Sequence, residues 1–514
     1  MAPMNVAGSV KEVCGKLRQY PVQLLLAIFL VMCCGATKKF QLFPMPWVAG
    51  NSECRKLVSR VPGVGPANMK MNASNGRLYT VTTLEELKPD CQEKAEVFVF
   101  VGESFTITTA YLVFFGLTKA IFNFVTGVCC DRFGRKWTLV AGWVVAIPLP
   151  LMVIFAENWW TAALSNLFLG MQQALVWSAT IFIMIDYFGK SNAGIAVGIN
   201  ETVGYTTISI VGVIAAAIMD EDSPRTTCYY VVITIILVGI VLGVAALKES
   251  KQVAAQEEAE VSGRAETVDE ATLTWPSGRS VTFSKAQSAF VYTSFINGPL
   301  MSINFAGLMA NFISGFAWGL FAKWMKNDYV VDGELMWTKL SKETIANITL
   351  CYGLPKGIFQ WIFGFAGDRI GRRWLITGGL AMCTLGLVIL AATGESASDP
   401  VAGFAAGSLF LGVGTAMMYS NNLAAVSDHT DPTWRSSALG AYRFWRDLGY
   451  AVGALINGAF ADGVGIFGSV LLTAALTALS AICVGVFYRE AETASAKAPM
   501  AVEAPVPEAV EAST

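Results

Sequence analysis

The sequence is short of charge and of histidine. Asp, Glu, Lys and Arg make up 14% of the 514 residues, whereas a soluble globular domain carries about 25%. The two signs nearly cancel, with 36 basic and 38 acidic side chains, and no basic block is dense enough to indicate nucleic-acid binding. A single histidine, His429, argues against a metal centre built from several imidazoles. No nucleophile, metal or nucleotide motif emerges either, so we expect neither an enzyme nor a bound cofactor.

Long apolar runs are abundant instead. Hydrophobic residues make up 54% of the chain and gather in uninterrupted stretches. About 20 apolar residues are enough to cross a hydrocarbon core of about 30 Å as a helix. The expected fold class is therefore an all-α membrane protein that lies in a lipid bilayer. Twelve transmembrane helices are predicted, near residues 20–43, 105–130, 138–156, 160–187, 192–219, 228–247, 301–325, 344–367, 374–393, 401–427, 434–461 and 465–488.

The basic residues of the short loops predict the orientation of the chain. On one side of the membrane, Arg225 is the only basic residue of the short loops, whereas the short loops of the other side hold eight. The side rich in basic residues is therefore predicted to be cytoplasmic, and an even number of spans places both termini there. A plasma membrane is the expected location, and an organellar membrane is the alternative. The predicted cytoplasmic loops hold Arg132, Arg135, Lys136, Lys190, Arg369, Arg372, Arg373 and Arg435.

These spans divide the chain into five parts. A cytoplasmic N-terminus, 1–19, precedes a six-helix bundle at 20–247, in which 44–104 forms a long extracytoplasmic loop. A charged cytoplasmic linker covers 248–300, and a second six-helix bundle covers 301–488. The tail, 489–514, is rich in Ala, Pro and Glu and is predicted to be disordered. Within the linker, residues 272–283 alternate around a Pro-Ser-Gly turn, which is typical of a β-hairpin.

The extracytoplasmic loop holds candidate modification sites. Cys54 and Cys91 lie on the side of the membrane where disulfides form, and Asn72 begins an Asn-Ala-Ser glycosylation sequon. We expect a Cys54–Cys91 disulfide and, if the chain is eukaryotic, a glycan on Asn72. Two free thiols and an unused sequon remain the alternatives.

An internal repeat divides the chain into two halves. Residues 116–137 read GLTKAIFNFVTGVCCDRFGRKW and residues 353–374 read GLPKGIFQWIFGFAGDRIGRRW, with 11 identities in 22 positions. Each copy closes an apolar run. The chain is therefore expected to be two homologous six-helix halves, and parallel halves of this kind form transporters with a binding site at their interface near the bilayer midplane.

Both copies resemble the loop motif of the major facilitator superfamily. Two further stretches, GINETVGY (198–205) and ALGAYRFWRDLGYAVGAL (438–455), resemble a little-characterised group of bacterial-type facilitators that includes magnetosome members. The resemblance implies two pseudo-symmetric six-helix bundles that rock between alternating-access states.

The repeated motif places fixed charges where helix ends meet at the cytoplasmic face, and we interpret it as a conformational latch. The alternative, that the charges only enforce topology, does not explain the repeated Asp and Gly. Asp186 and Asp428 are candidate partners of the motif arginines. The latch residues in the motif are Gly127, Asp131, Arg132, Gly134 and Arg135, and Gly364, Asp368, Arg369, Gly371 and Arg372.

Two lysines are predicted at mid-membrane. Lys119 and Lys356 each lie 12 residues before the motif Asp, which is roughly 18 Å along a helix. An ammonium there costs at least about 2.5 kcal/mol unless it faces a cavity or a counter-ion. A lysine stem reaches only about 6 Å, too short to snorkel to either interface. A permanent structural ion pair is the remaining alternative.

Further charges lie at a similar depth. Glu201 is in the fifth span, and Arg443, Arg446 and Asp447 are in the eleventh. Arg443 and Asp447 are four residues apart and are expected to pair, which leaves Arg446 without a local partner. The resemblance places all six charged residues around one cavity, with an excess of positive charge. Candidate substrate contacts are Lys119, Lys356, Arg443, Arg446, Asn123, Gln360, Trp177 and Tyr442, and candidate proton carriers are Glu201 and Asp447.

Three functions compete. The leading hypothesis is a monomeric secondary transporter that moves a small organic or inorganic anion, coupled to protons. The second is a proton-driven exporter of amphipathic cations or drugs, with Trp177, Trp361 and Trp445 as an aromatic wall. The third is a non-transporting receptor or scaffold with the same fold.

Overall fold

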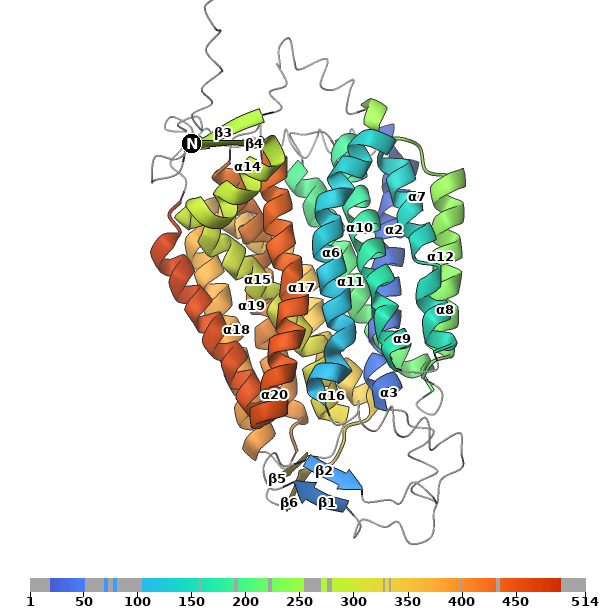
Figure 1. The fold of residues 1–514 in the computed structure, drawn as a ribbon, viewed down its shortest axis with the longest axis vertical. Coiled ribbons are helices and arrows are strands. Elements are labelled where there is room, and N and C mark those ends of the chain that lie inside the picture. The colour runs from blue at the N-terminus through green and yellow to red at the C-terminus, as the bar shows by residue number, and fades with distance from the viewer. Residues whose placement is uncertain are drawn as a thin grey trace, which may run out of the picture.

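The computed structural model describes residues 19–50, 69–72, 77–80, 104–156, 159–188, 193–220, 224–253, 270–274, 280–326, 329–331, 334–396, 399–430 and 435–490. Its helices form one bundle made of two halves (Figure 1). The first half contains α2 (Pro21–Leu42), α3 (Met45–Gly50), α6 (Phe105–Phe133), α7 (Arg135–Val145), α8 (Pro148–Ile154), α9 (Trp159–Leu164), α10 (Asn166–Phe188), α11 (Ala193–Ile218) and α12 (Thr227–Ala245). The second half contains α15 (Gly298–Trp318), α16 (Leu320–Lys326), α17 (Lys342–Ile370), α18 (Arg372–Ser396), α19 (Val401–Asp428) and α20 (Arg435–Phe487).

The bundle has two distinguishable ends. We call the end where α6 meets α7 and α17 meets α18 the inner end, after the predicted orientation, which itself stays a prediction. The hairpin of β3 (Glu270–Thr274) and β4 (Ser280–Ser284) lies at this end, next to α14 (Lys285–Val291) and a π-helical turn, Tyr292–Ile296. The opposite, outer end carries the hairpins of β1 (Met69–Asn72) with β2 (Arg77–Thr80) and of β5 (Tyr329–Val331) with β6 (Glu334–Trp337) (Figure 1).

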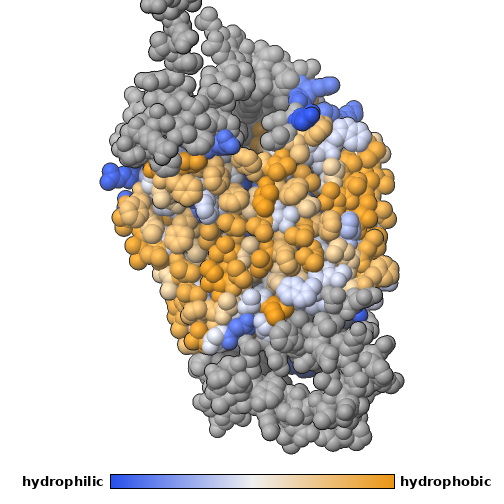
Figure 2. All heavy atoms as spheres, viewed as in Figure 1, coloured by the Kyte–Doolittle hydropathy of each residue, from blue (hydrophilic) through white to orange (hydrophobic). Residues whose placement is uncertain are grey.

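The exterior of the bundle is apolar. Within the part of the chain that the structure describes, ten helices are long and apolar enough to cross a membrane. Hydrophobic residues form a broad band across the visible face, with hydrophilic residues at its margins (Figure 2). In α12 only 33% of the most apolar window is buried, because a helix that is hydrophobic all round turns most of its surface toward lipid. The chain is therefore an all-α membrane protein, as expected.

The predicted count of twelve spans stays a prediction. Two segments would complete it. The long α20 breaks at Gly465, whose φ of 87° interrupts the helix and divides it into two lengths. The other is α17, which packs among the spanning helices although charged residues lower its hydropathy.

The glycines that open the two repeats have a packing role. A Cβ on Gly116 of α6 would lie 2.5 Å from the backbone nitrogen of Ala451 in α20. Its counterpart on α17, Gly353, would place a Cβ 2.3 Å from the Ser209 hydroxyl oxygen of α11. Both contacts join one half to the other, and small residues allow such close helix crossings in membranes. The first glycine of each repeat copy therefore lies at the interface between the halves and allows the helices to pack closely there.

The structure bears on several local predictions. The linker hairpin is confirmed, since β3 and β4 pair antiparallel with Thr272 opposite Thr282. Asn72 ends β1 opposite Arg77, and its glycosylation stays a prediction. Cys54 and Cys91 lie outside the described residues, so their disulfide also stays a prediction.

Candidate functional site

Asp447 of α20 is the centre of a buried polar cluster between the halves. Arg446 binds its carboxylate through two hydrogen bonds, each 3.1 Å long. Asn311 of α15 donates a third, at 2.7 Å, and Asn123 of α6 donates a fourth. The Lys119 ammonium lies 3.6 Å from the same carboxylate. One carboxylate thus holds together donors from both halves.

The expected pairing on α20 is wrong. Arg446, not Arg443, binds Asp447. The spacing of four residues allows a pair along a helix face, but Asp447 points toward the junction of α6 and α15, where the guanidinium of its neighbour Arg446 meets both carboxylate oxygens. Arg443 lies one turn nearer the inner end, and its Nε is buried without a hydrogen-bond partner among the described residues.

Lys356 of α17 lies in a cage of hydroxyls and aromatic rings. Its ammonium donates to the hydroxyl oxygens of Ser314, at 3.0 Å, and Tyr352, at 3.2 Å. It also lies 4.6 Å from the ring centre of Tyr205 and 5.2 Å from that of Tyr419. Rings and hydroxyls solvate the cation without neutralising it. The predicted mid-membrane lysine is therefore buried and faces the interior of the bundle.

A third central lysine, Lys38 of α2, escaped sequence analysis. Its ammonium lies 4.4 Å from the ring centre of Trp318 and donates to the Tyr450 hydroxyl at 3.3 Å. It is 1% exposed. In the sequence it only interrupts an apolar run, but a lysine in a predicted span is itself a signal of a buried site.

Glu201 of α11 is the second central carboxylate. Its Oε1 accepts a hydrogen bond of 2.9 Å from the Trp177 indole nitrogen of α10, whereas its Oε2 is buried without a partner among the described residues. Gly204, one turn further along α11, makes room for this indole, because a Cβ there would lie 2.3 Å from the Trp177 ring. Glu201 interacts electrostatically with both Lys119 and Lys356.

The hydrogen bonds of several polar atoms near Glu201 are incomplete among the described residues. Arg443 Nε is buried without a partner there, whereas the Asn422 amide and the Tyr442 hydroxyl pair at most with each other. Buried polar groups are normally hydrogen-bonded, so an orphaned set calls for a ligand or water. These atoms come from both sides of the interface, Glu201 from the first half and the others from the second.

Other predicted contacts lie elsewhere. The Gln360 amide donates to the Lys356 backbone oxygen within α17. Trp445 binds Ser294 in the π-helical turn, and Trp361 is 61% exposed on the outside of the bundle. The aromatic wall postulated for a drug exporter is therefore not assembled, because only Trp177 of its three members reaches the centre.

Each motif turn is held within its own half. Arg135 pairs with Asp186 at 3.1 Å, and Arg372 pairs with Asp428 at 3.3 Å. Gly134 and Gly371 have φ of 87° and 93°, which only glycine adopts readily. Arg132 and Arg369 are exposed, Gly127 and Gly364 continue α6 and α17, and the side chains of Asp131 and Asp368 lie outside the described residues. The latch role stays a proposal.

Two glutamates at the motif turns were missed. The Glu249 carboxylate accepts from the backbone nitrogens of Arg135, at 2.9 Å, and Lys136, at 3.1 Å. Glu490 accepts from the backbone nitrogen of Arg373 at 2.8 Å. Each glutamate therefore caps the helix that follows a motif turn. The available signal was positional, since a basic-acidic pair follows the last helix of each half.

The two halves are tied together at the outer end. Asp462 of α20 accepts hydrogen bonds from the Ser104 hydroxyl, at 2.8 Å, and from two backbone nitrogens at the start of α6. Lys323 of α16 donates to the Thr108 hydroxyl at 2.8 Å, and the Tyr111 hydroxyl donates to the Trp318 backbone oxygen. This arrangement closes the outer end of the interface.

Comparison with known proteins gives consistent matches. A profile of the Major Facilitator Superfamily matches residues 98–326 and again residues 300–510. The inner membrane transport protein YajR of Escherichia coli is 39% identical over 88 residues, which span 17% of this chain and 18% of the relative. The chain thus aligns with less than a fifth of that relative's length.

Solved structures share the fold. The nucleoside transporter NupG superimposes with a TM-score of 0.59 at 11% identity, over 91% of this chain and 99% of that one. A D-xylose-proton symporter does so with a TM-score of 0.58 at 14% identity, over 91% and 99%. Identities this low carry the fold alone.

Proposed function

Since this chain belongs to the major facilitator superfamily and is a multi-pass membrane transporter rather than an enzyme, we propose that it carries a small organic or inorganic anion across the membrane by alternating access, coupled to protons. The observation that carries the proposal is the charge of the central cluster. Among the described residues, five cations face two carboxylates there. The cations are Lys38, Lys119, Lys356, Arg443 and Arg446, and the carboxylates are Glu201 and Asp447.

The excess charge needs compensation. Asp447 is shared between Arg446 and Lys119, so it cannot neutralise both. Lys356 has hydroxyls and rings as its direct contacts, and the one carboxylate that interacts with it electrostatically among the described residues, Glu201, also interacts with Lys119. A buried cation without a counter-charge is costly, and an anion bound between Lys119, Lys356 and Arg443 would remove that cost. Neutral cargoes, such as the nucleoside and the xylose carried by the fold relatives, would leave it in place.

Glu201 is the proposed proton carrier. Its Oε2 lacks a donor among the described residues, whereas all the acceptor capacity of Asp447 is used. A proton on Oε2 would make that position neutral, and its loss would restore a negative charge beside the cationic centre. Binding of the anion and of the proton would then favour each other through this local charge balance.

The experiment is uptake by purified protein in liposomes. We expect uptake of an anion from a panel of monocarboxylates, dicarboxylates and phosphate, and no uptake of xylose or a nucleoside. Lys356→Gln removes the charge but keeps a hydrogen-bond donor and should lower anion uptake at least tenfold. Lys136→Gln, at the inner surface, is the matched control and should transport normally.

Two results would overturn the proposal. One is transport of a neutral sugar at equal rates by the parent and by Lys356→Gln, which would make the central charge irrelevant to the cargo. The other is absence of any uptake, with every ligand, by a protein whose folding is verified by thermal unfolding, which would favour a receptor or scaffold. Monomers are expected throughout, and size-exclusion chromatography with light scattering tests this.

A further inference from the structure

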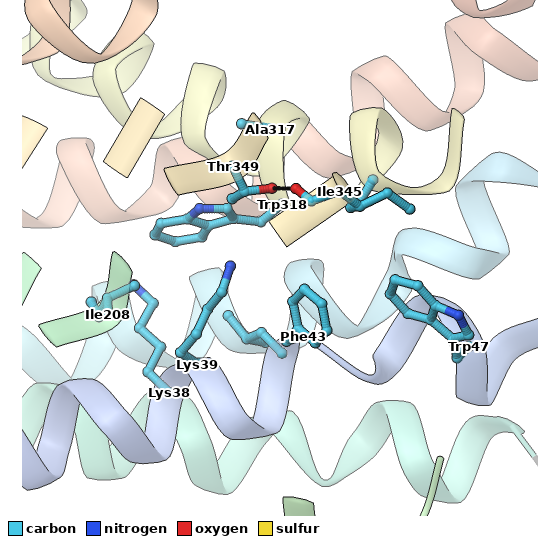
Figure 3. A pocket seen from close by; sticks show the side chains of 11 residues that line it. Lys38, Lys39, Phe43, Trp47, Ile208, Ala317, Trp318, Ile345 and Thr349 are labelled. Carbon is cyan, nitrogen blue, oxygen red and sulfur yellow. Dashed lines mark hydrogen bonds between the residues drawn. The ribbon is translucent and has the colours of Figure 1, made fainter. Parts of the chain in front are cut away.

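Among the described residues, two hollows away from the central carboxylates differ in what they have room for. The first lies beside Lys39, whose amine points toward Trp318 (Figure 3), and has a volume of about 20 Å³, enough for about one water molecule. The second is an open groove of about 410 Å³. Since a cavity of about 150 Å³ admits a benzene ring, the groove has room for a long apolar chain.

The groove lies between the two halves. Its wall on the first half is α6, with Ile121, Phe124 and Val125. The opposite wall consists of Phe444 of α20 and Phe290 of α14, the short helix that lies at the inner end beside α20 (Figure 1). The ring centres of Phe290 and Phe444 are 5.5 Å apart. This ring contact holds α14 against α20 as part of the wall.

The packing of α6 against α20 changes along their length. A Cβ on Gly458 of α20 would lie 2.7 Å from Thr106 Cα at the start of α6, in addition to the close contact at Gly116. Nearer the inner end, a Cβ on Gly127 of α6 or on Gly440 of α20 would meet no described atom within 4 Å. The two helices therefore pack tightly in their outer parts and loosely in their inner parts, where the groove lies.

The groove lies at the depth of lipid chains. Val125 and Ile121 precede the end of α6 at Phe133 by 8 and 12 residues, which is roughly 12 and 18 Å along a helix. Half of a hydrocarbon core measures about 15 Å. The Ile121 side chain is 47% exposed on a helix that is apolar enough to span the membrane. The acyl chains of the leaflet at the inner end can therefore reach the groove directly.

The chemistry of the groove selects an apolar occupant. Although Gln287 is one of its lining residues, no polar atom is exposed inside it. A water molecule needs two to four polar partners, so an apolar hollow does not hold water. An unfilled groove would also deprive its walls of van der Waals contacts on one side. A flexible hydrocarbon chain meets both conditions.

We propose that this groove binds one acyl chain of a phospholipid from the leaflet at the inner end. The chain lies between Ile121 and Val125 on one side and Phe444 on the other. Phospholipid is the assigned source because the bilayer supplies it in large excess over any other apolar ligand. Since α6 and α20 belong to different halves, the bound lipid contacts both and becomes part of their interface. The inference goes beyond the proposed function and holds for any cargo.

Photolabelling of the purified full-length chain in detergent tests the site. The probe is phosphatidylcholine with a diazirine in one acyl chain, added from far below to above equimolar amounts, so that detergent covers the rest of the apolar surface. Label in the groove, at residues 121–125, 287–291 and 444, should saturate at about one lipid per protein and be displaced by unlabelled phosphatidylcholine. Label on α12, whose Leu237 is 55% exposed, should rise in proportion to the lipid added.

Two variants fill the groove, and a third is their control. Val125→Trp places a large ring where the chain is proposed to lie and should lower the saturable label at least about fivefold. Ile121→Trp should do the same, and it serves if Val125→Trp folds poorly. Leu237→Trp adds the same ring to the exposed surface of α12 and should leave the label in the groove unchanged within about twofold.

Four results would overturn the site. The first is label in the groove that rises in proportion to lipid, as on α12, which would mean bulk lipid only. The second is absence of label in the groove, and the third is full saturable label in both Val125→Trp and Ile121→Trp. The fourth is saturable labelling by a fatty acid with the same diazirine chain but not by the phospholipid. No transport is measured, so such a failure would leave the proposed function untouched.

Discussion

At the residue scale, the two central carboxylates differ in how completely they are bound. Asp447 accepts from Arg446, Asn123 and Asn311 and lies beside Lys119, so it is a structural anchor as well as a charge. Glu201 accepts one hydrogen bond, from Trp177. A carboxylate therefore serves a different purpose in each of the two environments.

Substitution should separate these purposes. Asp447→Asn leaves the Arg446 guanidinium buried without a counter-charge and should lower the free energy of unfolding by about 3 kcal/mol. Glu201→Gln keeps an acceptor for the Trp177 indole and should leave stability nearly unchanged, yet abolish the response of uptake to a pH gradient while exchange at equal pH continues. Chemical unfolding and uptake with and without the gradient measure the two effects. A gradient response retained by Glu201→Gln would contradict its assignment as proton carrier.

Sequence reasoning placed most of these residues but not their partners. A charge in an apolar run marks a buried site, and this identified Lys119, Lys356 and Glu201. It could not identify which arginine of α20 meets Asp447, because that depends on the direction of the carboxylate relative to α6 and α15. Lys38 was not identified, because together with Lys39 it only interrupts the apolar run of the first predicted span.

At the scale of elements, α7 and α18, the helices that follow the two motif turns, begin in the same way. A glycine with positive φ ends α6 or α17, and a glutamate from the end of the same half then accepts the first backbone donors of α7 or α18. Carboxylates at helix N-termini accept hydrogen bonds from the free backbone N–H groups there, and their negative charge is attracted to the positive end of the helix dipole.

Removal of these caps should destabilise each half separately. Glu249→Ala loses an acceptor for two backbone donors and should cost about 1–2 kcal/mol of unfolding free energy, whereas Glu490→Ala, which is exposed and serves one donor, should cost less than about 1 kcal/mol. Because the sites lie in different halves, their effects should add in the double variant. Thermal and denaturant unfolding test this, and strong non-additivity would show that the halves do not unfold independently.

The elements themselves were largely predictable from apolar runs and from the repeat. The apolar runs did not indicate where the helices break within a span. Pro148 begins a new helix after α7, and Gly319 separates α15 from α16, yet neither interrupts the hydropathy of its span. A scale that sums hydrophobicity over a window does not register a change of backbone direction.

At the scale of the whole molecule, hydrogen bonds at the outer end join the two halves. Asp462 belongs to the second half, and the three donors that it binds belong to the first. Opening toward the outer side must break these bonds, so they stabilise the outward-closed state specifically.

Asp462→Ala should shift the molecule toward the outward-open state. Loss of about 1–2 kcal/mol corresponds to roughly a tenfold change in the ratio of the two states. A cysteine at Thr349, in a chain whose reactive native cysteines are replaced by serine, should then react about tenfold faster with a membrane-impermeant reagent. Asp399→Ala, which removes a bond to the Val401 nitrogen within one half, is the control. An unchanged rate in Asp462→Ala would mean that other contacts hold the outer end shut.

The surplus of cations at the centre has an electrical consequence. An empty carrier of this kind is itself a mobile charge, and each elementary charge moved through the full membrane field exchanges about 2.3 kcal/mol with a potential of 100 mV. If the cargo is an anion, as proposed, the loaded carrier is closer to neutral and the field acts on it less. The membrane potential would therefore act mainly on the step in which the unloaded protein returns. The rate of the transport cycle would then depend on the resting potential as well as on the gradient of the cargo.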